Sequence, residues 1–124
     1  EGLAAQLHDS SDELLQRIST FDQSTESMRE ALNQYYDLLA DDIQVFRLVW
    51  NDAAIQHSPI GQRLRSQARD FYAYLVGPNP SVEDRMRAAG AVGIIRLSLE
   101  QRGVDPDKHK EVIVERAFQV MTDL

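Results

Sequence analysis

Apolar side chains recur every three or four residues along nearly the whole chain, a spacing that places them on one face of an α-helix. The pattern begins at Leu3, ends at Leu124 and predicts helices over residues 3–20, 25–40, 43–56, 59–76, 82–102 and 106–124. Within the first helix, Ser10 and Glu13 are spaced as in a capping box, so this helix either runs through or restarts there. Alternation of apolar and polar residues never persists beyond a few positions, so we expect no strand.

Residues that start and stop helices support these boundaries. Ser58 offers a hydroxyl group as N-cap, and the proline that follows it suits the first helical position. Gly77 and the prolines after it end that helix, and Ser81-x-x-Asp84 opens the next. The turns are short and no linker is long enough to separate domains, so residues 1–124 are predicted to form one all-α domain of about six helices.

The helix predicted over 82–102 has almost no polar face, although it contains Gly90 and Gly93. Each glycine in a helix interior costs roughly 0.5–1 kcal/mol relative to alanine. We interpret the two glycines as permitting close helix packing or as leaving space for a ligand. One side of this helix is predicted to face the core: Val82, Met86, Ala89, Gly93 and Leu97. The other side of this helix is predicted to form a dimer interface, together with apolar residues of the last helix that lie outside its main apolar face. The interface residues are Ala88, Val92, Ile95 and Leu99 of the first of these helices and Val114 and Phe118 of the second.

Aromatic side chains are concentrated in the helices predicted between residues 25 and 76. They form either an ordinary core or the wall of an apolar cavity, the usual composition of a small-molecule pocket. For the second alternative, Asn51 and Gln67 are the candidate polar anchors. The predicted ligand-binding wall is completed by Tyr35, Phe46, Trp50, Phe71, Met86 and Gly90.

Charge narrows the choice of partners. The net charge is −7, so these residues themselves are not expected to form a nucleic-acid-binding surface, which needs clustered Lys and Arg. The predicted helix 59–76 nevertheless carries Arg63, Arg65 and Arg69, of which the last two are one turn apart. These arginines either form a solvated face or recognise an acidic ligand.

Nothing in the sequence indicates catalysis or metal binding. His8, His57 and His109 lie near predicted helix ends among polar residues, and no Glu-x-x-His pair is present. The absence of cysteine excludes disulfides and thiolate metal sites. No nucleophile-elbow, zinc-protease or phosphate-loop motif occurs. We therefore expect no enzymatic activity, no metal and no cofactor.

The sequence also contains no targeting or membrane signal. No apolar run approaches the roughly 20 residues of a membrane span, and no basic segment with an apolar stretch opens the chain. We expect a cytoplasmic location and no membrane partner. The first residues, EGLAAQL, read as a helix entered midway, which suggests a fragment or a processed chain.

Three stretches resemble the C-terminal regulatory domain of TetR-family transcriptional regulators. They are MREALNQYYDLLADDIQVFRLVWNDAAIQHSPIGQRLRSQARDFYAYL, DRMRAAGAVGIIRLSLEQ and GVDPDKHKEVIVERAFQVM. The resemblance covers almost the whole chain, with residues 1–20 standing where the family has the helix that connects to its DNA-binding unit. The family's helix-turn-helix is absent from these residues.

This resemblance implies a domain that binds a small apolar or amphipathic effector. It also implies a homodimer formed through the last two helices as a four-helix bundle. DNA binding would belong to the N-terminal helix-turn-helix of the parent repressor or activator, not to these residues. The alternative is a helical protein–protein interaction module without a small-molecule pocket, and an enclosed apolar cavity would distinguish the two.

Overall fold

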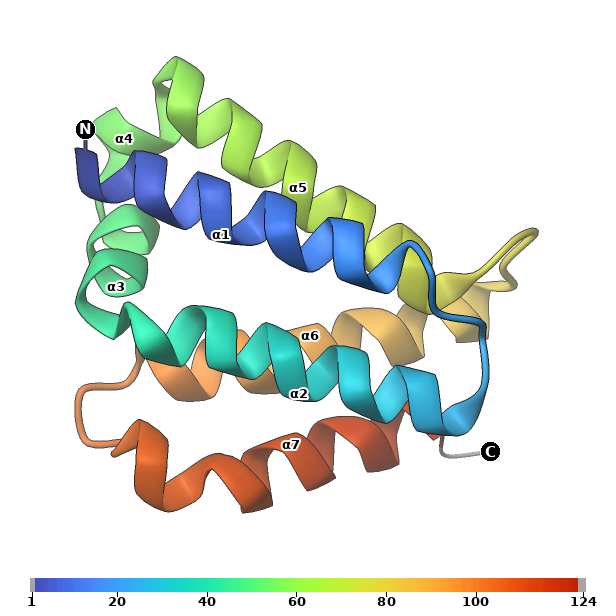
Figure 1. Cartoon of the computed structure of the whole chain (residues 1–124). Helices are drawn as coiled ribbons and strands as arrows, with labels where there is room; N and C mark the ends of the chain where they lie inside the picture. Colours follow the sequence, from blue (N-terminus) through green and yellow to red (C-terminus); the bar gives the residue numbers. More distant parts are fainter. Residues whose placement is uncertain (1, 123–124) are drawn as a thin grey trace.

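The computed structural model describes residues 2–122, apart from the side chain of Leu3 (Figure 1). This part of the chain is all-α, as predicted, with seven helices and no strand. The predicted apolar side chains of Leu3 and Leu124 lie outside the described residues. The helices are α1 (Gly2–Ile18), α2 (Thr25–Asp41), α3 (Ile43–Asn51), α4 (Ala53–His57), α5 (Pro59–Val76), α6 (Val82–Glu100) and α7 (Pro106–Thr122).

The long helices pack as two pairs with α2 between them. α1 lies along α5, α6 lies along α7, and α2 contacts α1, α6 and α7 (Figure 1). The main hydrophobic core joins α1, α2, α5, α6 and α7, while a smaller cluster joins the start of α1 to α3 and α5. Leu38 and Trp50 pack against both clusters, so the junction of the two clusters lies beside these side chains.

Local capping explains most of the helix boundaries. The hydroxyls of Ser24 and Ser58 each accept a hydrogen bond from the backbone N–H three residues further along. Ser81 and Asp84 form both hydrogen bonds of a capping box, each at 3.0 Å. Gly77 ends α5 with a φ of 73°, a conformation that glycine adopts without strain. The helix ends predicted at Ser58, Gly77 and Ser81 are confirmed.

Two boundaries in the first half of the chain differ from alternatives that the sequence allowed. The helix predicted over 43–56 is divided at Asp52, whose carboxylate accepts hydrogen bonds from the N–H groups of Ala54 at 2.9 Å and Ile55 at 3.2 Å. Asp52 therefore caps a new short helix, which accounts for the seventh element. By contrast, α1 runs unbroken past Ser10, so the proposed restart at that residue is wrong.

The two faces of α6 are the reverse of those predicted from the sequence. The predicted interface residues Ala88, Val92, Ile95 and Leu99 are buried in the chain's own core. The predicted core residues Val82, Met86 and Leu97 are instead 63%, 66% and 60% exposed. The hydrophobic pattern of α6 surrounds the helix, so contacts with neighbouring helices decide which side is buried.

Close approach of α4 to the first turn of α5 depends on Gly61. A Cβ atom at this position would overlap the backbone carbonyl oxygens of Ile55 and Gln56. Backbone carbonyls have no rotamer by which to move away, so the turn between the helices would have to open. Only glycine allows the connection around Ser58 to be this tight.

We predict that Gly61→Ala lowers the free energy of unfolding by about 1–3 kcal/mol, the usual cost of overpacking. Chemical denaturation measures the change. Gly103→Ala is the matched control, because a Cβ at Gly103 would have no neighbour within 4 Å. Equal stabilities for the two variants would contradict this account of the α4–α5 contact.

The loop between α1 and α2 is organised by Asp22. Its carboxylate accepts hydrogen bonds from the Ser24 N–H at 3.0 Å and the Ser27 hydroxyl at 2.7 Å. Its carbonyl accepts a hydrogen bond from the Tyr74 hydroxyl at 2.8 Å, which ties the loop to the end of α5. Hydrogen bonds from Ser24 and then Ser27 lower the pKa of Asp22 to about 2.

This lowered pKa predicts a pH-dependent contribution to stability. A carboxyl group whose pKa is depressed by folding stabilises the fold above its unfolded pKa of 3.8 and loses this contribution as pH falls towards 2. The difference in melting temperature between wild type and Asp22→Asn is therefore expected to be constant above about pH 5 and to shrink between pH 4 and pH 2. A difference that stays constant down to pH 2 would contradict the assignment.

Candidate functional site

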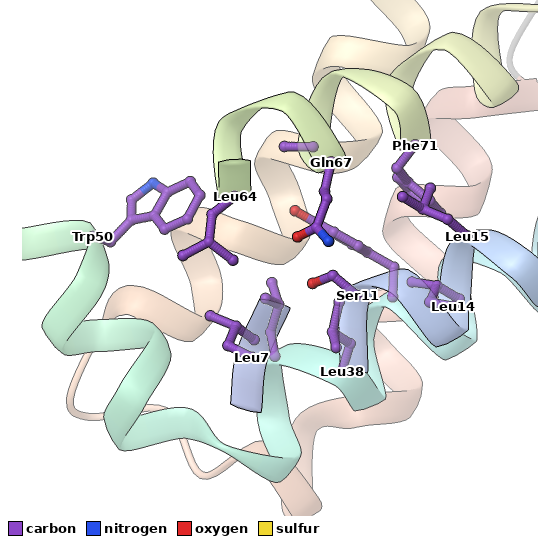
Figure 2. A pocket seen from close by; sticks show the side chains of 12 residues that line it. Leu7, Ser11, Leu14, Leu15, Leu38, Trp50, Leu64, Gln67 and Phe71 are labelled. Carbon is purple, nitrogen blue, oxygen red and sulfur yellow. The ribbon is translucent and has the colours of Figure 1, made fainter. Parts of the chain in front are cut away.

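A small apolar cavity, partly open to solvent, lies where α5 faces α1 and α2. It has a volume of about 40 Å³, enough for a water molecule or a methyl-sized group. Tyr35 and Phe71 stack at 4.5 Å between ring centroids with an interplanar angle of 12°. Figure 2 shows Phe71 towards one end of this void and Trp50 at the other, with Leu64, Gln67 and Ser11 between them. The complete lining is Leu7, Ser11, Leu14, Leu15, Tyr35, Leu38, Leu39, Trp50, Leu64, Gln67, Ala68 and Phe71.

A larger pocket adjoins this void on the far side of Trp50, Leu64 and Ala68, which line both. We call the two the inner void and the outer pocket. The outer pocket has a volume of about 320 Å³, within the range of small-molecule sites, and is open to solvent on one side. Residues of α3, α4, α5 and α6 form its wall: Val49, Trp50, Gln56, Gly61, Leu64, Arg65, Ala68, Arg69 and Arg96.

Several contacts fix Trp50 at the boundary between the two spaces. The centroid of the Phe46 ring lies 5.2 Å from that of the indole. The guanidinium of Arg96, on α6, lies 4.6 Å from the centroid of the Trp50 ring. This guanidinium–indole contact is a cation–π interaction. The Gln56 side chain donates to the Trp50 carbonyl at 2.6 Å. Arg47 anchors α3 against the end of α6 by donating to the Leu99 carbonyl at 2.9 Å.

Gln67 is the main polar group of the inner void. Its amide nitrogen donates to the His8 carbonyl at 3.0 Å and to the Asp12 carboxylate at 2.7 Å, which ties α5 to α1. Its amide oxygen is buried and accepts no hydrogen bond from any residue between 2 and 122. A buried acceptor without a donor is unfavourable by about 1–3 kcal/mol, so this oxygen favours a ligand or water that donates to it.

Positive charge lines the outer pocket. Arg65 and Arg69 contribute from α5 and Arg96 from α6, and the wall contains no Asp or Glu. Within the described part of the chain, none of the three makes an ion pair. Burial raises the pKa of Tyr35, and the nearby positive charge of Arg96 only partly offsets this, so the phenol stays neutral over the physiological range.

Four of the eight predicted ligand-binding residues are brought together. Tyr35, Trp50, Gln67 and Phe71 all line the inner void, and Phe46 supports the Trp50 ring from behind without lining either space. Three of the four predicted aromatic residues and one of the two candidate polar anchors thus lie at one site.

The other three predicted residues lie elsewhere, which corrects the predicted pocket wall. Asn51 is exposed and donates to the Arg47 carbonyl at 2.7 Å, and Met86 is on the exposed face of α6. Gly90 faces α7, because a Cβ there would lie 2.9 Å from the Cγ1 of Val120. Two of these errors share a cause: rotation of α6 by half a turn relative to the prediction moves Met86 and Gly90 away from the aromatic helices.

Sequence reasoning missed the contribution of Arg96 and of α1. Arg96 carries the only charge between residues 88 and 99. An isolated charge in an apolar helix is the feature by which the sequence could have marked Arg96 as a functional residue. Most of the α1 residues that line the inner void belong to the apolar face of the helix. The local sequence does not distinguish them from ordinary core residues. Arg65 and Arg69 were identified as a pair on one face, although the sequence left open whether they face solvent or a ligand.

The predicted dimer-interface residues are all buried within the protomer. Ala88, Ile95 and Leu99 are completely inaccessible, and Val92, Val114 and Phe118 are at least nine-tenths covered. A second subunit would find almost no surface of these side chains to contact. The exposed apolar surface of the same two helices consists instead of Val82, Met86 and Leu97, with the 62%-exposed Val112 on α7.

The described residues contain no group of three or more His, Asp or Glu side chains that could hold a metal ion. None of the described helices is long and apolar enough to cross a membrane. In comparisons with known protein families, curated proteins and solved structures, none matches the chain. Functional inference therefore depends on the geometry of the site.

Proposed function

We propose that this chain is the effector-binding and dimerisation domain of a TetR-like transcriptional regulator. The observation that carries the proposal is the outer pocket of about 320 Å³, which shares the lining residues Trp50, Leu64 and Ala68 with an apolar inner void. A largely apolar concave site with a few polar groups is the usual form of a small-molecule site. The effector is a small apolar or amphipathic molecule, and DNA is bound by the parent protein only.

The proposed mechanism is a population shift transmitted by α1. This helix lines the inner void with Leu7, Ser11 and Leu14, and it is tied to α5 through Gln67. An effector that enters between α5 and α1 fits one spacing of the two helices better than another. Differential affinity for the two conformers then shifts their equilibrium and moves the N-terminal end of the domain.

The volume of the pocket gives a direct test with Ala68, which lines both spaces. We predict that Ala68→Leu fills the junction and abolishes binding of apolar and amphipathic molecules. Binding is measured by the fluorescence of Trp50, the single tryptophan, and by the rise in melting temperature. At a hundredfold excess over Kd, a ligand stabilises the wild-type protein by about 2.7 kcal/mol.

Ala73→Leu is the matched control, because Ala73 lies on the exposed face of the same helix. It is expected to leave both signals unchanged. If a chemically broad panel gives neither signal with the wild-type protein, the sensing function is wrong and the helical interaction module becomes the better explanation. Unaltered binding by Ala68→Leu would place the ligand outside this pocket.

The second element of the proposal is a homodimer through α6 and α7. Val82, Met86, Ala89, Gly93 and Leu97 follow one another at helical spacing along the exposed side of α6. A Cβ at Gly93 would have no neighbouring atom of residues 2–122 within 4 Å, so no contact among these residues requires glycine there. Close approach of a helix from a second copy of this chain accounts for both the glycine and the exposed apolar side chains.

We predict that Leu97→Glu converts a dimer to a folded monomer. Burial of an unpaired carboxylate in the interface costs several kcal/mol, whereas Leu97 is 60% exposed in the protomer and tolerates the charge. Sedimentation velocity measures the oligomeric state and circular dichroism the fold.

The control is Leu48→Glu, because Leu48 is an equally apolar side chain on α3 with 50% exposure. This variant is expected to remain dimeric. A wild-type protein that is monomeric at high micromolar concentration would contradict the proposed interface, and so would equal dissociation by the two substitutions.

A further inference from the structure

The outer pocket differs in charge from the rest of the molecule. The chain has 20 acidic residues against 13 Lys and Arg, yet this wall has three arginines and no carboxylate. Arg65 and Arg69 lie one turn apart on α5, and Arg96 faces them from α6. Three like charges around one pocket repel one another, and an anion between them would relieve that repulsion.

The hydrogen-bonding capacity of these arginines is largely unused inside the protein. Arg65 donates to the Gln56 carbonyl, Arg96 lies on the Trp50 ring, and no described residue bonds to Arg69. The Nε of Arg96 is buried and has no acceptor among residues 2–122. Each guanidinium has five N–H donors in a planar fork that fits a carboxylate through two parallel hydrogen bonds.

The remainder of the pocket wall is apolar. Val49, Trp50, Leu64 and Ala68 lie beside the arginines, and the last three lead to the inner void. A ligand that satisfies the whole wall therefore has an anionic head and an apolar body. A neutral apolar molecule would leave the arginines without an acceptor, and a small inorganic anion would leave the indole and the aliphatic side chains uncovered.

We propose that the effector is an amphipathic carboxylate. Its head group binds between Arg65, Arg69 and Arg96, and its apolar body lies against Trp50, Leu64 and Ala68. This inference depends on the proposed effector-binding function and adds the chemical class of the ligand. It also makes Arg96 a direct contact of the effector. Arg96 lies on α6, the helix that carries the proposed dimer face.

Two matched sets of small molecules test the proposal with the full chain at pH 7. The first set is octanoate, 1-octanol and octylammonium, and the second is 4-phenylbutyrate with its alcohol and ammonium counterparts. Dissociation constants come from calorimetry and from Trp50 fluorescence. The protein variants are Arg69→Gln and Arg96→Gln. Arg63→Gln is the control, because Arg63 is exposed on the same helix and does not line the pocket.

We expect each carboxylate to bind at least tenfold more tightly than its alcohol, and the ammonium compounds to bind worst. Arg69→Gln and Arg96→Gln should each weaken carboxylate binding about tenfold, the usual effect of losing a charge-assisted hydrogen bond, and leave alcohol binding nearly unchanged. Arg63→Gln should change neither. Higher salt should weaken carboxylate binding selectively.

The failures of the two proposals are distinguishable. If alcohols bind as tightly as carboxylates, or if Arg63→Gln has the same effect as Arg69→Gln, the carboxylate inference is wrong while a small-molecule site remains. If neither set binds and the broader panel used with Ala68→Leu also fails, the effector-binding function itself is wrong. Circular dichroism of Arg96→Gln separates loss of the ligand contact from loss of fold, and Arg69→Gln tests the head-group site without disturbing the Trp50 contact.

Discussion

Stacking of Phe71 on Tyr35 joins α5 to α2 beside the site, and the position of the inner void depends on this contact. The rings are 4.5 Å apart at the C-terminal half of α5, where the helix joins the main core. Towards its N-terminal half, α5 is supported by α4 through the close contact at Gly61 and joins the smaller cluster at Leu64. Between these two attachments the packing is incomplete, so a void opens beside Gln67, and the outer pocket lies on the other side of Trp50, Leu64 and Ala68.

α6 has two functional surfaces in this account. Arg96 faces the outer pocket and contacts Trp50, whereas Leu97, the next residue, faces outwards on the proposed dimer surface. Under the proposed function, an effector held by Arg96 therefore bears on the same helix that contacts the second subunit. Gly90 permits close packing against Val120, and under the proposed dimer Gly93 would permit close packing of a second subunit on the outer side of this helix.

The sequence predicted features that local interactions determine and failed where tertiary contacts decide. N-caps at Ser58 and Ser81 were identified because each capping hydrogen bond spans three residues. The faces of α6 were reversed because its apolar residues surround the helix, so periodicity contained no information about the buried side. Three of the four predicted pocket residues that came together are aromatic, because large buried rings reach across the junctions between helices. Arg96 was missed because its role depends on where Trp50 lies.

Nuclear magnetic resonance of the full chain with octanoate tests the central claim most directly, because it locates the ligand as well as detecting it. The protein is labelled at the arginine side chains, the indole and the methyl groups. We expect the largest chemical-shift changes at Arg96 Nε–H, the Trp50 indole, the Leu64 methyls and the Ala68 methyl. Signals of Leu48 and Val112, which lie on other surfaces, should move little. Shifts confined to the exposed face of α6 and α7, or no saturable shift at Arg96 and Trp50, would contradict an effector site in this pocket.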